Sequence, residues 1–166
     1  IATVTRDITP NLIAESALRE SEARFRRLVD SNIIGVIVCD CKGNITQAND
    51  AFLETISRTR KELVAGEVLW HEITPLEYHA LDQKALEELR TSGVCTPFEK
   101  EYLRPDESRV SVLIGAALVE ESQDTCVAFV LDITERKQME QALRQSEERL
   151  RTVLENMPVM LDAVDE

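Results

Sequence analysis

Four cysteines have the most distinctive chemistry in this sequence: Cys39, Cys41, Cys95 and Cys126. Cys39 and Cys41 form a C-x-C pair, but no second cysteine pair or nearby histidine completes the four ligands of a structural zinc site. All four cysteines lie in apolar or strand-like stretches. This setting predicts buried, reduced thiols in a cytosolic protein, and no metal site.

A histidine followed by an acid and a threonine-proline pair suggests phosphotransfer. The stretch His71-Glu72-Ile73-Thr74-Pro75-Leu76 is one residue shorter than the H-E-x-x-T-P-L box in which histidine accepts a phosphoryl group. No glycine-rich nucleotide-binding segment accompanies it. Pro75 also stands where an H-E-x-x-H zinc protease has its second histidine. Because no set of nucleophile, base and oxyanion donors can be assembled either, the sequence predicts no catalytic residue and no enzyme activity.

Composition and charge narrow the classes of partner. The chain has 166 residues, of which 43% are hydrophobic and only 4% aromatic, so one ordinary domain with a mostly aliphatic core is expected. A net charge of −12 disfavours nucleic acid and anionic membrane surfaces, since both attract clustered Lys and Arg. No apolar run approaches the roughly 20 residues that span a bilayer, and no signal peptide opens the chain. We therefore expect a cytoplasmic protein without direct membrane contact.

An internal repeat is the most informative feature of the sequence. Residues 7–29 read DITPNLIAESALRESEARFRRLV and residues 132–154 read DITERKQMEQALRQSEERLRTVL. At this fixed offset the two segments share DIT, ALR, SE and two further arginines without a gap. A repeat of about one domain length indicates a tandem array of similar units. The chain is then one full unit with the edges of two neighbours.

Both copies of the repeat carry the pattern of a helix. Thr9 and Thr134 suit the N-cap, and Pro10 suits the first helical position. Apolar residues then recur at heptad spacing in the second copy, interrupted by Ser146, at Met139, Leu143, Leu150, Val153 and Met157. One interpretation is a helix packed on its own domain. The favoured one is an imperfect coiled coil that joins successive domains and pairs two protomers.

The unit between the helices has two strands, then several helices, then three strands. Residues 34–39 and 45–48 should form a hairpin around Gly43, a residue free to adopt positive φ. Asn49-Asp50 should cap the next helix. The remaining expected elements are helical pieces at 51–57, 61–65 and 68–73, a long helix at 76–91, and strands at 97–104, 109–118 and 125–133. This order predicts an α+β fold, an antiparallel sheet with helices on one face.

The long helix has a pattern of its own. Tyr78, Leu81, Ala85 and Leu89 recur at helical spacing and are expected to face the core. Ser92-Gly93 should end the helix, because glycine readily takes the left-handed conformation of a C-terminal cap.

The resemblance to a known family is carried by several short motifs in order. The run D40-x-x-G43-x-I45-x-x-A48-N49-x-x-F52 resembles the opening hairpin of a PAS domain. KELVAG at 61–66 and W70 with ITP at 73–75 resemble its middle. PFEKEYLRPDESRVSVLIGA at 97–116 and AFVLDITERK at 128–137 resemble its closing strands and exit motif. The chain departs from the pattern at Glu107, where glycine is usual, so this turn should be strained or differently shaped.

The resemblance implies a sensory input module of a multi-PAS bacterial signalling protein such as a sensor histidine kinase or a diguanylate cyclase. It implies a five-stranded antiparallel sheet with short helices on one face, flanked by N- and C-terminal linker helices. Haem-binding members take an axial ligand from the helix that holds His79, which makes this residue a weak cofactor candidate. The flavin motif N-C-R-F-L-Q does not occur. No cofactor is assigned, and a ligand-free structural spacer is the alternative.

Domain boundaries and partners follow from the repeat and the resemblance together. We expect a remnant of a preceding unit at 1–9, a linker helix at 10–30, the PAS domain at 31–134, an exit helix at 135–157 and the start of a following unit at 158–166. The expected partners are a second copy through the linker helices, adjacent PAS and effector domains, and a small-molecule ligand. The triplet Asp132, Ile133 and Thr134 ends the last strand and starts the exit helix, so we expect it to transmit the signal.

Overall fold

The computed structural model describes residues 33–119 and 124–157, together with residues 15, 16, 19, 20, 22, 23, 27 and 29. The chain divides into two compact units, Ile1–Asp132 and Ile133–Glu166. The described residues between 15 and 29 are helical. The predicted remnant strand at 1–9 and the predicted start of a further unit at 158–166 lie outside the described residues.

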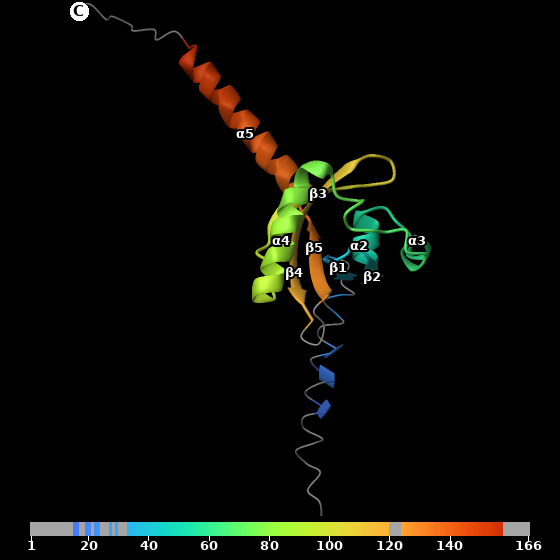
Figure 1. Cartoon of the computed structure of the whole chain (residues 1–166). Coiled ribbons are helices and arrows are strands. Elements are labelled where there is room, and N and C mark those ends of the chain that lie inside the picture. Colours follow the sequence, from blue (N-terminus) through green and yellow to red (C-terminus); the bar gives the residue numbers. More distant parts are fainter. Residues whose placement is uncertain are drawn as a thin grey trace, which may run out of the picture. The chain divides into compact units, whose positions relative to one another are not determined.

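The first unit is built on the predicted five-stranded antiparallel sheet (Figure 1). Its strand order is β2-β1-β5-β4-β3, so the first strand lies between the second and the last. The strands are β1 (Gly35–Asp40), β2 (Ile45–Ala48), β3 (Phe98–Leu103), β4 (Arg109–Leu118) and β5 (Thr125–Asp132). Residues of β1 alternate between buried and half-buried, which is the period of two of a sheet with one face against a core.

Helices cover one face of this sheet. Along the chain they follow the first two strands and precede the last three. They are α2 (Asp50–Thr55), α3 (Arg60–Val64), the 3₁₀ turn η1 (Leu76–Tyr78) and α4 (His79–Ser92). The core between the layers is mostly aliphatic, as the composition predicts, with Phe52 and Tyr102 edge to face at a centroid separation of 6.2 Å. The predicted α+β fold class is confirmed.

Asn49 ties the start of the sheet to the start of the helical layer. Its Oδ1 accepts from the backbone N–H of Phe52 at 3.1 Å and of Val36 at 2.8 Å, while its Nδ2 donates to the carbonyl of Ile34 at 2.9 Å. One side chain thus caps α2 and pins the first strand beside it. The cap predicted at Asn49-Asp50 is confirmed, with Asn49 at the N-cap position.

Two helical predictions are wrong in the middle of the domain. Residues 68–73 do not form a helix, because Leu69 forms an isolated β-bridge with Asn44 and the Trp70 N–H donates to the Gly43 carbonyl at 2.9 Å. The long α-helix begins at His79 rather than Leu76, after a 3₁₀ turn that follows Pro75. It ends at Ser92 with Gly93 in the left-handed region, as predicted.

The predicted inward face of the long helix needs a correction as well. Leu81 is 39% exposed, whereas Asp82 is only 7% exposed and lies on the buried side with Leu89. The prediction holds at Ala85 and Leu89, which face the sheet, and is wrong at Leu81, because the next residue, the acid Asp82, has a buried partner and takes the inward position.

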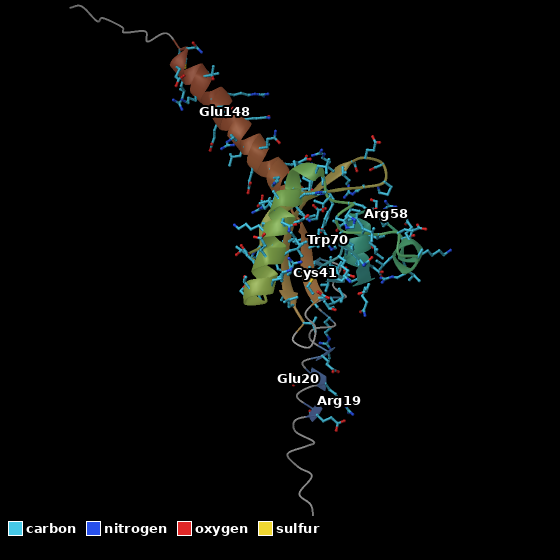
Figure 2. All side chains as sticks on the ribbon, in the orientation of Figure 1. Arg19, Glu20, Cys41, Arg58, Trp70 and Glu148 are labelled. Atoms are coloured by element: carbon cyan, nitrogen blue, oxygen red, sulfur yellow. The ribbon has the colours of Figure 1, made fainter. Side chains whose placement is uncertain are left out.

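The second unit contains α5 (Thr134–Glu155), the helix predicted from the repeat. Its side chains project into solvent around the whole helix, and none is buried (Figure 2). Thr134 is the first helical residue, and Ile133, whose side chain cannot cap, occupies the N-cap position. The N-cap predicted at Thr134 is therefore wrong, because β5 ends at Asp132, one residue earlier than predicted, and the helix already begins at Thr134. No helix among the described residues is long and apolar enough to cross a membrane.

The turn between β3 and β4 contains the departure singled out in the sequence. Glu107 has φ +64°, in the left-handed region that favours glycine. Its N–H donates to the Arg104 carbonyl at 3.0 Å, and the Arg104 N–H donates to the Ser108 carbonyl at 2.9 Å. The hairpin closes well, but a Cβ atom at this φ costs about 1–2 kcal/mol.

We expect Glu107→Gly to raise the free energy of unfolding by about 1 kcal/mol, because relief of the left-handed strain exceeds the entropy that glycine adds to the unfolded chain. Urea unfolding of the two proteins measures the change. Glu107→Ala is the matched control, since it removes the same carboxylate and keeps the Cβ atom. An equal gain in both variants would show that the charge, not the backbone, is responsible.

Candidate functional site

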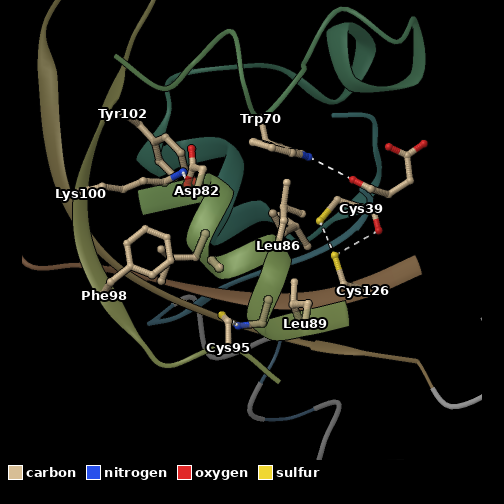
Figure 3. A pocket seen from close by; sticks show the side chains of 15 residues that line it. Cys39, Trp70, Asp82, Leu86, Leu89, Cys95, Phe98, Lys100, Tyr102 and Cys126 are labelled. Carbon is tan, nitrogen blue, oxygen red and sulfur yellow. Dashed lines mark hydrogen bonds and ion pairs between the residues drawn. The ribbon is translucent and has the colours of Figure 1, made fainter. Parts of the chain in front are cut away.

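A cavity of about 60 Å³ lies between the sheet and α4 (Figure 3). Most of its wall is apolar, with contributions from β1, β3, β4, β5 and α4. Lys100 and Asp82 bring two charged side chains into this wall, and three cysteines bring thiols. The lining residues are Ile37, Cys39, Asp40, Trp70, Asp82, Ala85, Leu86, Leu89, Cys95, Phe98, Lys100, Tyr102, Ile114, Ala116 and Cys126.

The polar centre of the cavity is a buried ion pair between β3 and α4. Lys100 Nζ lies 2.6 Å from Asp82 Oδ1 and donates to Thr74 Oγ1 at 3.0 Å. The three residues are 2%, 7% and 3% exposed. Thr74 is itself held by donating to the Trp70 carbonyl at 2.7 Å. The pair therefore links the strand, the long helix and the loop before it.

Aromatic rings surround the ammonium group of Lys100. Its Nζ lies 4.8 Å from the ring centroid of Tyr102 and 5.9 Å from those of Trp70 and Phe98. Burial lowers the pKa of Lys100, and the neighbouring Asp82 carboxylate works against that shift. The rings and the carboxylate together compensate part of the cost of removing this cation from water.

This pair was not predicted from the sequence, although the two-residue alternation of β3 indicates that Lys100 points inward. Phe98, Lys100 and Tyr102 alternate with two glutamates, so a strand that turns its aromatic residues inward must also turn Lys100 inward. The partner on the helix could not be identified in the same way, because Asp82 is one acid among several on α4.

Two polar atoms of the cavity wall have no hydrogen-bond partner among the described residues. They are Tyr102 Oη and the second carboxylate oxygen of Asp82, Oδ2. Burial raises the pKa of Tyr102 well above its ordinary value, so the hydroxyl keeps its proton and remains a donor at neutral pH. The cavity thus offers one donor and one acceptor beside an ammonium group.

The sulfur atoms of Cys39 and Cys126 lie 3.2 Å apart on the neighbouring strands β1 and β5. Both thiols are buried, and Cys95 is buried too, as predicted, whereas Cys41 is half-buried. The mutual hydrogen bond raises the pKa of Cys39, with burial acting in the same direction, and lowers the pKa of Cys126. The four cysteines are free. Among the described residues no group of three or more His, Cys, Asp or Glu side chains could hold a metal ion.

Neither histidine lines the cavity. His79 Nε2 lies 3.0 Å from the carbonyl oxygen of Thr74. His71 is exposed and packs edge to face on Trp70 at a centroid separation of 5.8 Å. Cofactor sites usually have volumes of roughly 300–1,000 Å³, so the geometry gives no support to His79 as a haem ligand, which stays a prediction.

The predicted transmission residues Asp132, Ile133 and Thr134 stand at the end of β5 and the start of α5. The boundary between the two compact units falls within this triplet, between Asp132 and Ile133. The structure does not bring the triplet to the cavity wall. Its role in transmission stays a prediction.

Comparisons with known proteins agree with this architecture. A family model described as a PAS domain matches residues 33–135. The hybrid signal transduction protein dokA of Dictyostelium discoideum is 37% identical over 118 residues, which are 71% of this chain and 7% of that protein. The sensor histidine kinase TmoS of Ectopseudomonas mendocina is 29% identical over 139 residues, 81% of this chain and 14% of the kinase. The chain thus spans only a small part of the length of these relatives.

Among solved structures, the PAS domain of an HTR-like protein from Haloarcula marismortui superposes with a TM-score of 0.53 at 26% identity. The match covers 72% of this chain and 98% of that domain. A whole solved domain thus corresponds to the sheet and its helices.

We expect Lys100→Met to lower the free energy of unfolding by about 3–5 kcal/mol, because it leaves the Asp82 carboxylate buried without its partner. The double variant Asp82→Leu/Lys100→Met should recover most of this loss, since it removes both charges. Urea unfolding measures both.

Lys84→Met is the matched control on the exposed side of α4, and it should change the free energy of unfolding by no more than about 0.5 kcal/mol. If the double variant is as unstable as Lys100→Met, the cost arises from lost packing rather than from an unpaired charge.

Proposed function

Because this chain belongs to the PAS domain family, we propose that it is a non-catalytic sensory and dimerisation module that passes a signal through α5 to an effector domain. A histidine kinase is the effector we infer, because TmoS is one. The observation that carries the proposal is the apolar seam of α5, defined by Met139, Leu143, Ser146, Leu150, Val153 and Met157.

The seam has the spacing of a coiled coil. Its members alternate at intervals of four and three residues, which are the a and d positions of a heptad repeat. Its five apolar side chains are 59–62% exposed in the single chain, so each loses apolar surface to water when a second helix covers it. Ser146 is the one polar member, and a polar residue at such a position favours one register at some cost in stability.

A second copy of the chain is the partner we infer for the seam. The same sequence motif recurs in residues 7–29, so an identical protomer carries the pattern twice. Ion pairs at helical spacing support α5 outside the seam, for example Arg151 with Glu155 at 2.8 Å. Adjacent PAS units and the effector are then the neighbours along each chain.

The triplet Asp132, Ile133 and Thr134 is the inferred point of transmission. The sheet strand and the outgoing helix are joined by one residue, Ile133. A displacement of β5 must therefore reach α5 through very few rotatable bonds. We infer a cytoplasmic location for the module, which the four free thiols support because such thiols persist in reducing compartments.

The input reaches the module through the cavity beside Lys100 in this proposal. Tyr102 Oη and Asp82 Oδ2 are placed to bind a small polar molecule that has both an acceptor and a donor. A volume of about 60 Å³ limits that molecule to a few non-hydrogen atoms. The same small volume favours the alternative, a structural spacer whose cavity is filled by its own side chains.

We expect the chain to form dimers and Leu143→Glu to dissociate them, because the variant places a carboxylate in the apolar seam. Sedimentation equilibrium measures the change, with at least a tenfold weaker association expected, about 1.4 kcal/mol. Gln141→Glu adds the same charge on the opposite side of α5 and should dimerise as the wild type does. Equal dissociation constants for both variants would remove the seam from the proposal.

The variant Tyr102→Phe distinguishes the proposed sensor from the alternative, a structural spacer. For a sensor, native mass spectrometry of the wild type should reveal a small bound molecule, and the variant should retain less of it because one donor is gone. For a spacer, neither protein carries added mass, and the variant is at least as stable as the wild type because a buried, unsatisfied hydroxyl has been removed. The second outcome would contradict the proposed input.

A further inference from the structure

Cys39 and Cys126 form a close pair of thiols that has no role in the proposed function. They are direct partners in the register of β1 and β5, which runs unbroken over six pairs from Gly35↔Val130 to Asp40↔Thr125. Their sulfur atoms are 3.2 Å apart, and Cys126 Sγ also lies 3.4 Å from the Cys39 carbonyl oxygen. Both side chains point to the cavity side of the sheet (Figure 3).

The Cα separation of the two residues lies within the range of a disulfide. Two residues further along the same register, the Cys41 N–H donates to the Asp124 carbonyl at 3.1 Å. Bonded and non-bonded pairs alternate in an antiparallel ladder, so Cys39 and Cys126 form a bonded pair, whose Cα atoms lie about 5.5 Å apart. Disulfides join Cα atoms about 4.4–6.8 Å apart. The Cβ atoms of a bonded pair lie roughly 5 Å apart, whereas a disulfide holds them about 3.5–4.5 Å apart, so bond formation also draws β1 and β5 closer together at this point.

We propose that Cys39 and Cys126 are a dithiol oxidation site at which hydrogen peroxide forms a reversible disulfide between β1 and β5. In the first step the Cys126 thiolate attacks one peroxide oxygen, the O–O bond breaks, and the departing hydroxide takes a proton to become water. In the second step the Cys39 sulfur attacks the sulfenic acid, loses its proton, and releases a second water as the S–S bond forms. Two thiols lose two electrons, and one peroxide gains them.

The two thiols have different surroundings, which assigns their roles. The hydrogen-bonded contact between the two sulfurs lowers the pKa of Cys126. The same contact raises the pKa of Cys39. Cys126 is therefore the attacking thiolate and Cys39 the resolving thiol.

The cavity gives a small oxidant access to both sulfurs. Its volume of about 60 Å³ holds a molecule of two heavy atoms such as hydrogen peroxide, since a water needs only about 10–15 Å³ by this measure. Burial and the neighbouring Asp40 carboxylate act against the thiolate, since both raise the pKa of Cys126. Cys95 also lines the cavity, and its sulfur accepts the Ala116 N–H at 3.1 Å.

The decisive experiment treats the 166-residue chain with hydrogen peroxide, blocks the remaining thiols and maps the products by mass spectrometry. We expect the loss of two hydrogen atoms and of two titratable thiols, and a tryptic link between peptides 28–42 and 110–136. Dithiothreitol should restore both thiols. Trp70 should report the reaction by fluorescence, since it is the only tryptophan of the sequence and donates to the Asp40 carbonyl beside Cys39.

Matched variants assign the link, because peptide 28–42 contains Cys41 as well as Cys39. The link should persist in Cys41→Ser and in Cys95→Ser and disappear in Cys126→Ser. A link that is lost in Cys41→Ser, oxidation that stops at sulfenic or sulfinic acid, or thiols that stay reduced would each overturn the proposal. The wild type and Cys41→Ser decide the question even where Cys126→Ser does not fold.

Discussion

The ion pair between Lys100 and Asp82 is the interaction on which the rest of the domain depends. It joins the edge strand β3 to the long helix α4, and through Thr74 it reaches the loop before that helix. Without this link, α4 would meet the sheet only through a few apolar residues such as Leu89. The position of the helix over the sheet also sets the volume and the wall of the cavity.

A buried pair of this kind is poor evidence for extra stability. Removing two charges from water costs several kcal/mol per ion, and the attraction between them often only offsets that cost. A pair inside an apolar wall does specify geometry, because Lys100 Nζ must meet Asp82 Oδ1 and Thr74 Oγ1 at the same time. In this domain the pair fixes which face of α4 lies inward, against the hydrophobic pattern that would have placed Leu81 there.

The cavity and α5 belong to different compact units, and their chemistry differs accordingly. The cavity has tightly defined donors, acceptors and thiols within a small volume. The helix has only a repeated apolar seam that a second chain can cover. The two are connected along the chain by β5, which contributes Cys126 to the cavity wall and leads directly into Ile133. Any change that locks or releases β5 therefore acts on the strand from which the outgoing helix starts.

The sequence by itself determined the family, the order of strands and helices, and the repeated helix, because these depend on short-range patterns. Each of three features can be recognised within a few residues: the hairpin around Gly43, the Asn49 cap and the heptad of α5. The predicted strand bounds 45–48 and 109–118 agree with the structure. Predictions made from short sequence patterns were wrong where contacts between distant parts of the chain override those patterns. The bridge from Leu69 to Asn44 replaced a predicted helix, and the end of β5 at Asp132, one residue earlier than predicted, moved the N-cap from Thr134 to Ile133.

Only the tertiary structure decided which residues form the cavity. Lys100 and Asp82 are 18 positions apart, and Cys39 and Cys126 are 87 positions apart. Nothing in the local pattern links the members of either pair. Cys39 and Cys126 meet because β1 lies beside β5 in the sheet, and Lys100 meets Asp82 because α4 packs on the face to which β3 turns Lys100. Both pairings are set by the burial of the whole core rather than by any local preference.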